Sequence, residues 1–293
     1  MKRSEVITEF KKAISGGYAL GSFSPRNTVL IDAVISAAEN TCSPVMVQIS
    51  SNEMRWFDLQ PREFADAFRA RMKDVNVPVI LHLDHTYDPE TIRAAIDAGF
   101  DSVMIDGSKL PFEENIALTR EAVQYAHAAD VAVEGELGNI GGTDKLETGG
   151  DTALYTIPSQ AKLFAEATGV DTLAVSVGTA HGVYRTANPR IDFERLTAIR
   201  ELIPETPLVL HGGSGLPMNT VKRAIALDGM GGIVKLNIAT DLEIIFQKVL
   251  GVSRMPNADV VKLDPAMLKQ ACHEVQLFVE DRIRTFLGSD HKA

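Results

Sequence analysis

The chain has 293 residues, and its composition and charge exclude several classes of protein. Hydrophobic residues make up 45% and charged residues 23%, which is typical of a folded globular protein and not of a disordered, collagen-like or coiled-coil chain. The formal net charge of −10 repels phosphate backbones and anionic lipids at long range, so we expect neither nucleic acid nor a membrane as a partner.

Eight short apolar runs, rich in β-branched residues, recur along the chain and are predicted to be strands. They are residues 18–23, 45–49, 77–83, 102–105, 131–136, 172–177, 208–210 and 232–236. Between them lie helical patterns such as 89–98 and 115–129, in which apolar residues return every three or four positions. Two further helical patterns, 241–252 and 264–286, follow the last run.

Strands that are apolar on both faces and followed by helices predict a parallel sheet covered on both sides. Eight such units in fewer than 300 residues predict a (β/α)8 TIM barrel with extra C-terminal helices, forming one domain over residues 1–293. An open doubly wound sheet fits the same alternation. Its usual GxGxxG fingerprint after an early strand is absent from the sequence, as is a P-loop, and we therefore favour the barrel.

The segment 138–150 is polar and contains five glycines, which predicts a long loop between the fifth and sixth strands. Structureless loops longer than about 12 residues usually have a function in compact domains. We therefore expect a mobile lid over a binding site, with a tolerated surface insertion as the alternative.

Cysteine content indicates the compartment. Cys42 and Cys272 are too few for a disulfide framework, which is typical of a reducing environment. Charged residues rather than an apolar segment follow the basic start, so no signal peptide is predicted. No run approaches the ~20 apolar residues of a membrane span. We expect a cytoplasmic protein.

Histidines follow three of the predicted strands, at the end where TIM-barrel enzymes place their active sites. His85, His181 and His211 come after the third, sixth and seventh runs. Three imidazoles that converge and leave a fourth position open are typical of a catalytic zinc ion. A single histidine is more often structural, so the prediction depends on all three together. We expect structural roles for the other histidines, which are His82, His127, His273 and His291.

Carboxylates occur beside these histidines. Asp84 could exchange a proton with a substrate hydroxyl, provided that the chain bends at the strand end, because successive strand residues point to opposite faces. Alternatively, Asp84 orients the neighbouring histidine. Asp106 and Glu136 could form a second, weaker metal position or could bond to neighbouring backbone, and the sequence leaves both possibilities open.

Two segments after the seventh and eighth strands indicate how an anion could bind. The glycine-rich turn 211–215 offers backbone N–H groups and the hydroxyl of Ser214, and residues 237–240 follow the eighth strand. The loops after strands seven and eight are a frequent phosphate site in TIM barrels. We expect a small sugar phosphate as the substrate, with a tight bend and no ligand as the alternative.

In these segments the chain resembles the class II, zinc-dependent ketose-bisphosphate aldolases, which comprise fructose- and tagatose-bisphosphate enzymes. The resemblance covers residues 15–245 and lies in six blocks: LHLDH (81–85), DGSKLPFEEN (106–115), VEGELG (133–138) before Gly141-Gly142, GTAHGVY (178–184), HGGSG (211–215) and VKLNIAT (234–240). Ala239 and the short chain resemble the tagatose-type branch more closely.

The resemblance implies a role for each candidate residue. His85, His181 and His211 would hold Zn2+, and Asp84 would donate and accept the proton of the C4 hydroxyl. Asp106 and Glu136 would form a secondary metal site, and a monovalent cation, Na+ or K+, would lie near the phosphate. Binding of dihydroxyacetone phosphate and its aldehyde partner would involve Ser50, Gly182, Gly212, Gly213, Ser214, Asn237, Ile238, Ala239 and Thr240.

The mobile loop departs from the family pattern. The family carries a glutamate directly after Gly-Gly that moves the C3 proton, whereas this chain has Thr143 and Asp144 there. The role therefore falls to Asp144 or to the non-aligned Glu147. Loss of the glutamate also leaves open a sugar-phosphate-binding protein without catalysis.

The acceptor side departs as well. The usual Phe-Asn near the first strand is Phe23-Ser24, followed by Arg26, and the glycine usual after the second strand is Asn52. The resemblance implies glyceraldehyde 3-phosphate as the default acceptor. An aldehyde whose carboxylate binds Arg26 or Arg55 is one alternative. A different enzyme is also possible: a metal-dependent sugar-phosphate isomerase or epimerase, which would use the same zinc without cleaving a C–C bond.

The C-terminal helical patterns carry apolar residues such as Leu263, Met267 and Val275. They suggest a subunit contact in a homodimer or homotetramer, although packing in the core explains them equally well.

Overall fold

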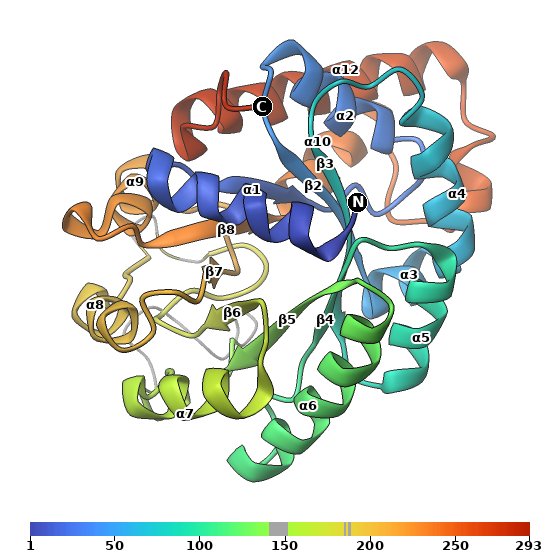
Figure 1. The fold of residues 1–293 in the computed structure, drawn as a ribbon. Helices are drawn as coiled ribbons and strands as arrows, with labels where there is room; N and C mark the ends of the chain where they lie inside the picture. Colours follow the sequence, from blue (N-terminus) through green and yellow to red (C-terminus); the bar gives the residue numbers. More distant parts are fainter. Residues whose placement is uncertain (141–151, 185, 187–188) are drawn as a thin grey trace.

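Residues 1–140, 152–184, 186 and 189–293 are described by a computed structural model of the chain. Within these residues, eight parallel strands close into a barrel in chain order, with β1 paired to both β2 and β8 (Figure 1). Helices surround the barrel. The predicted TIM barrel is therefore confirmed.

Each predicted apolar run overlaps one strand. The strands are β1 Leu20–Phe23, β2 Val45–Ser50, β3 Val79–Thr86, β4 Ser102–Ile105, β5 Ala132–Leu137, β6 Thr172–Val175, β7 Leu208–Leu210 and β8 Ile233–Ile238. The largest difference lies in β3, which continues three residues beyond the predicted run and so contains Asp84 and His85.

The helices between the strands are α2 Ile31–Asn40, α3 Ser51–Phe57, α4 Pro61–Arg71, α5 Pro89–Ala98, α6 Phe112–Ala128, α7 Pro158–Thr168, α8 Phe193–Leu202 and α9 Met218–Ala226. Local sequence sets their ends. In α5, for example, the side chain of Asp88 accepts a hydrogen bond from the N–H of Thr91, and Gly99 ends the helix in the left-handed conformation. Short 3-10 turns occur at η1 Thr152–Leu154 and η2 Leu227–Gly229.

The chain continues after β8 as α10 Thr240–Leu250, α11 Asn257–Val260, α12 Pro265–Asp281 and the π-helical turn η3 Arg282–Leu287. Helix α12 packs against α2 and α10, so the extra C-terminal helices are also confirmed (Figure 1). Among the described residues, no helix is both long and apolar enough to cross a lipid bilayer.

Helix α1, Arg3–Gly16, was not among the predicted elements. It lies across the end of the barrel at which the strands begin (Figure 1). Val6, Phe10 and Ala13 return on one helical face and form a buried cluster with inward residues of the strands, which are Leu20, Met46, Ile80, Ala132 and Val234. Helix α1 therefore closes the lower end of the barrel.

The inner faces of the strands change from apolar to polar toward the opposite end. In β3, Ile80 belongs to the apolar cluster under α1, whereas His82 and Asp84, two and four residues later, contact polar groups of other strands. The intervening Leu81 and Leu83 pack outward in the main core. The expectation of strands apolar on both faces is therefore wrong for the upper interior, where hydrogen-bonded polar side chains fill the barrel.

Asp171, directly before β6, ties α1 and α6 to the base of the barrel. Its carboxylate accepts hydrogen bonds from Arg3 Nη2 at 2.7 Å, from His127 Nε2 at 2.9 Å and from the N–H of Val133 at 2.8 Å. Burial opposes ionisation of this carboxyl, but the bonds from His127 and Arg3 outweigh it and lower its pKa.

Replacement of Asp171 by Asn should reduce the free energy of unfolding at pH 7 by about 1–3 kcal/mol, because buried donors lose their charged acceptor. A carboxyl with a lowered pKa stabilises the fold above its unfolded pKa of about 3.9 and loses this contribution as the pH falls through the folded value. The difference from wild type, measured by urea unfolding, should therefore shrink below about pH 4.

Asp66→Asn provides the control, because Asp66 and Arg69 form an exposed pair, and it should cost less than about 1 kcal/mol. Equal stability of the Asp171 variant and wild type at pH 7 would contradict the assigned role.

Candidate active site

Three imidazoles converge at the carboxyl end of the barrel. Nε2 of His85 lies 3.0 Å from Nε2 of His181 and 2.8 Å from Nδ1 of His211. Ligand nitrogens about 2.0–2.1 Å from a tetrahedral zinc ion are about 3.3–3.4 Å apart, so small outward movements would admit an ion. The fold thus brings together the three histidines singled out in the sequence, and they form one of the groups able to hold a metal ion.

A bulge in β3 aims two adjacent residues at this site. The register between β3 and β4 shifts between Leu83 and Thr86, and His85 has a φ of 26°. Bulges redirect side chains, and a positive φ is strained for a residue other than glycine. The bend expected at the strand end therefore occurs inside the strand, and it allows both Asp84 and His85 to face the interior.

Carboxylates orient two of the imidazole rings. Nδ1 of His85 lies 3.1 Å from Oδ2 of Asp106, and Nε2 of His211 lies 2.8 Å from Oε1 of Glu134. When each of these ring nitrogens donates its N–H outward, the other nitrogen keeps a lone pair toward the centre. Glu134 was not among the predicted site residues, although its place two residues before Glu136 on a strand puts it on the same face.

The histidines differ in their protonation. Burial, followed by the charge on His85, lowers the pKa of His181 to about 3. Burial likewise lowers the pKa of His211 well below its usual range, so both are in the neutral form that binds metals. Burial also opposes protonation of His85, but three neighbouring carboxylates outweigh it and raise the pKa to about 10. The surroundings of His85 therefore favour a positive charge.

Glu136 supplies a direct test of whether these residues fit a cation. Its Oε2 atom is buried, has no hydrogen-bond partner in the described part of the chain, and lies 3.7 Å from Nδ1 of His85 and 3.8 Å from Nδ1 of His211. Burial and the charge of Asp106 raise its pKa well above the usual range. An open carboxylate oxygen beside converging imidazoles fits a divalent cation.

Asp106 is engaged differently. Its Oδ1 accepts hydrogen bonds from the N–H and the hydroxyl of Ser108, at 3.0 and 2.6 Å, while its Oδ2 faces His85. Asp106, Glu136 and His85 also form a group able to hold a metal ion. Both alternatives raised from the sequence thus have a counterpart, since Asp106 bonds to nearby backbone and Glu136 stays open.

Asp84 is held by side chains of two other strands, β2 and β8. Its Oδ2 accepts from Nε2 of Gln48 at 2.9 Å, and its Oδ1 accepts from Nδ2 of Asn237 at 3.0 Å. Gln48 in turn accepts a hydrogen bond from Ser22. Burial raises the pKa of Asp84, which brings a carboxyl group closer to the range useful for proton exchange. Gln48 was missed as a positioning residue because the partner it holds is visible only in the fold.

The segments after β6 and β7 meet closely. A Cβ on Gly212 would lie 2.3 Å from the carbonyl oxygen of Ala180, and Gly212 has a φ of 69°, so this position requires glycine. The hydroxyl of Tyr184 donates to the carbonyl of Gly212 at 2.8 Å and accepts from the N–H of Ala180 at 3.0 Å. The N–H of Gly213 donates to the carbonyl of Asn237.

The remaining predicted substrate residues lie at the same end. Gly182 follows His181, Ile238 ends β8, and Ala239 and Thr240 begin α10. The hydroxyl of Ser214 accepts a hydrogen bond from the first turn of α10. Two buried oxygens here, Oδ1 of Asn237 and Oγ1 of Thr179, have no partner among the described residues. The N-terminus of α10 at this end suits an anion, whereas the open oxygen of Asn237 is an acceptor and suits a cation.

Ser50 ends β2 and is paired in register with Asp84 of β3. The hydroxyl of Ser50 accepts from the N–H of Glu53 and caps α3. Asp144 and Glu147, with residues 141–150 of the predicted lid, lie outside the described residues.

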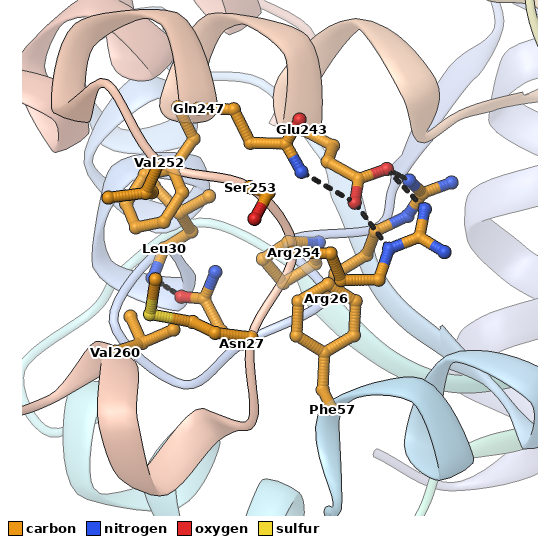
Figure 2. Close-up of a pocket in the computed structure, with 13 residues that line it drawn as sticks. Arg26, Asn27, Leu30, Phe57, Glu243, Gln247, Val252, Ser253, Arg254 and Val260 are labelled. Atoms are coloured by element: carbon orange, nitrogen blue, oxygen red, sulfur yellow. Dashed lines mark hydrogen bonds and ion pairs between the residues drawn. The ribbon is translucent and has the colours of Figure 1, made fainter.

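A buried ion-pair cluster lies on the side where the family resemblance implies aldehyde binding. Nε of Arg26 donates to Oε1 of Glu53 at 2.7 Å, and its Nη1 donates to Glu243. In Figure 2, Glu243 is joined to both Arg26 and Arg254, and Nε and Nη2 of Arg254 bind it at 2.7 and 2.8 Å. Arg26 is only 8% exposed. These contacts argue against Arg26 as a group that binds a substrate carboxylate, because protein carboxylates already bind its Nε and Nη1.

Ser24 and Asn52, the other departures on this side, also have protein partners. The hydroxyl of Ser24 donates to Oε2 of Glu53 at 2.7 Å, and Oδ1 of Asn52 accepts from Arg55. Arg55 is exposed, so of the two arginines considered as carboxylate-binding groups it is the one that a ligand could reach.

Comparisons with known proteins agree with this geometry. The profile of the class-II fructose-bisphosphate aldolase family matches residues 5–292. The YdjI aldolase from Escherichia coli K12 is 32% identical over 98% of both chains, with a TM-score of 0.82. A putative fructose-1,6-bisphosphate aldolase from Coccidioides immitis is 30% identical, covers 97% of this chain and 96% of its own, and has a TM-score of 0.82. Fructose-bisphosphate aldolase from Campylobacter jejuni is 25% identical over 100% and 97% of the two chains, with a TM-score of 0.79.

Replacement of Arg26 by Met should reduce the free energy of unfolding by about 3 kcal/mol, because it breaks a buried ion pair. This value is at the lower end of the usual cost, since Glu243 still has Arg254 as a partner. Arg69→Met, in an exposed pair, is the control. If urea unfolding of the Arg26 variant matched wild type while KM for a carboxylate-bearing substrate rose, Arg26 would be a ligand-binding group after all.

Proposed function

This chain belongs to the class-II fructose-bisphosphate aldolase family and is an aldehyde lyase, and we propose that it uses zinc to cleave a ketose bisphosphate reversibly. The products are dihydroxyacetone phosphate and an aldehyde. The observation that carries this proposal is the convergence of His85, His181 and His211 beside the buried, doubly hydrogen-bonded Asp84.

Zinc held by the three histidines would polarise the ketone carbonyl and stabilise negative charge on the donor fragment. Asp84 then takes the proton of the C4 hydroxyl as the C3–C4 bond breaks. The C4 carbon leaves as the aldehyde, and the electron pair of the broken bond stays with the donor. A loop acid, Asp144 or Glu147, delivers the proton to C3. Condensation runs the same steps in reverse.

The phosphate of the donor is proposed to bind the turn after β7 and the start of α10. Backbone groups of Gly182, Gly212 and Gly213, the hydroxyl of Ser214, and residues 237–240 would hold it. The open oxygens of Asn237 and Thr179 support a ligand here, and oxygen ligands of this kind would suit Na+ or K+ near the phosphate. Asp106 and Glu136 are proposed as the secondary metal position.

Glyceraldehyde 3-phosphate is the proposed acceptor, and Ala239 supports a tagatose-type enzyme. An aldehyde with a carboxylate remains a second candidate because exposed Arg55 stands at the altered rim, beside Asn52. If the acceptor is this aldehyde, fructose and tagatose bisphosphates should both be cleaved slowly. Ser50, at the end of β2, is proposed to contact the acceptor.

The assembly and location are also proposals. We propose that residues 1–293 form one domain that acts in the cytoplasm as a homodimer or homotetramer. Exposed apolar side chains on α12, Met267 and Leu277, support a subunit contact at this helix.

Purified protein should release dihydroxyacetone phosphate from fructose or tagatose bisphosphate, and a strong chelator should abolish this release because the metal stabilises the developing charge. Zinc or cobalt should restore it. His181→Ala should lose tight zinc binding, whereas the exposed His291→Ala should keep it. Full cleavage in excess chelator would rule out the metal mechanism, and interconversion of sugar phosphates without triose release would indicate an isomerase.

Asp84→Ala should lower the cleavage rate by roughly 10² to 10⁴, the usual contribution of a general acid–base group, while zinc stays bound. Asp97→Ala, at an exposed position of α5, should retain the wild-type rate. If the Asp84 variant cleaves at full rate with normal zinc content, another group transfers the C4 hydroxyl proton.

A further inference from the structure

Lys235 on β8 places a fully buried ammonium group inside the barrel, below the histidine cluster. Its Nζ lies 2.8 Å from Oε2 of Glu134 and 3.3 Å from Nε2 of His82. Buried lysines are rare unless an opposite charge accompanies them, and Glu134 is that charge. None of the catalytic steps above uses Lys235.

The ammonium lies within a group of side chains that could otherwise hold a metal ion. The ligand atoms of His82, Asp84 and Glu134 all lie within 4.8 Å of one another. Two of these three residues contact Lys235 directly. Lys235 is therefore a cation built into the chain at this place.

Glu134 connects this cation to the histidine cluster. One of its oxygens accepts from Lys235, and the other lies 2.8 Å from Nε2 of His211. Its other donor, the hydroxyl of Thr172, is 3.4 Å away, which makes a weak hydrogen bond. Lys235 is thus the main group in the described structure that balances and anchors the carboxylate behind His211.

On its other side, the ammonium of Lys235 contacts His82, which is neutral in the arrangement described next. When Lys235 donates to Nε2 of His82, Nδ1 of His82 carries the proton and donates to the hydroxyl of Ser102 at 3.0 Å. His82 is then neutral and adds no second charge, so the positive charge of Lys235 is directed to Glu134.

We propose that Lys235 is a positioning residue for the metal centre. By balancing the charge of Glu134, it keeps this carboxylate bonded to Nε2–H of His211, and the Nδ1 lone pair of His211 then points to His85 and His181. The inference rests on the proposed zinc site. Without Lys235, Glu134 would be an unpaired carboxylate in the barrel interior and would no longer fix the ring.

The test compares Lys235→Met with the double variant Glu134→Gln/Lys235→Met. Zinc affinity is measured by competition with a chromophoric chelator, and the control is Lys222→Met on the exposed face of α9. Lys235→Met should weaken zinc binding by about 10- to 100-fold, the usual effect of losing an outer partner of a metal ligand. The double variant should return to within a few-fold of wild type, because a glutamine oxygen accepts from His211 without a counter-charge.

The double variant contains no unpaired buried charge, so it decides the question even if Lys235→Met does not fold. Wild-type affinity in Lys235→Met, or no recovery in the double variant, would overturn the proposal. A second readout needs no metal: ¹⁵N NMR of the histidine rings in zinc-free protein should show His211 protonated at Nε2. Protonation at Nδ1 instead would also overturn it. Wild-type protein that binds no zinc would contradict the proposed function, while the ring signals would still test the role of Lys235.

Discussion

The candidate site depends on an excess of carboxylate charge around three converging imidazoles. Asp84, Asp106 and Glu136 all raise the pKa of His85, and the positive charge of Lys235 nearby is already balanced by Glu134. Charges withdrawn from water need partners. A divalent ion at the histidine nitrogens would provide one, and the open oxygen of Glu136 shows where the balance is incomplete.

Periodicity explains how the fold creates this arrangement. Every second residue of β3 and β5 faces the interior. From the base to the mouth of the barrel, these residues are Ile80, His82 and Asp84 in β3, and Ala132, Glu134 and Glu136 in β5. Helix α1 covers the apolar base, and the polar upper half is left for chemistry. The bulge in β3 adds His85 to the same face as Asp84.

The barrel could be predicted from the sequence because eight β-branched runs and their helices are local patterns. The three histidines could be predicted because each stands at or just after the end of a predicted strand. The roles of Gln48 and Lys235 could not be predicted, since they depend on partners on other strands. Arg26 shows the opposite failure. Its charge suggests that it binds a substrate carboxylate, but Glu53 and Glu243, which are distant in sequence, already bind it. Spacing identifies candidate chemistry, and only the packed structure shows which donors remain free.

X-ray absorption at the zinc edge of active, purified enzyme tests the central claim most directly. The account predicts one zinc per chain with three nitrogen scatterers at about 2.0–2.1 Å and an additional oxygen. Fewer than three imidazole ligands, or a spectrum dominated by sulfur, would contradict a metal centre built from His85, His181 and His211.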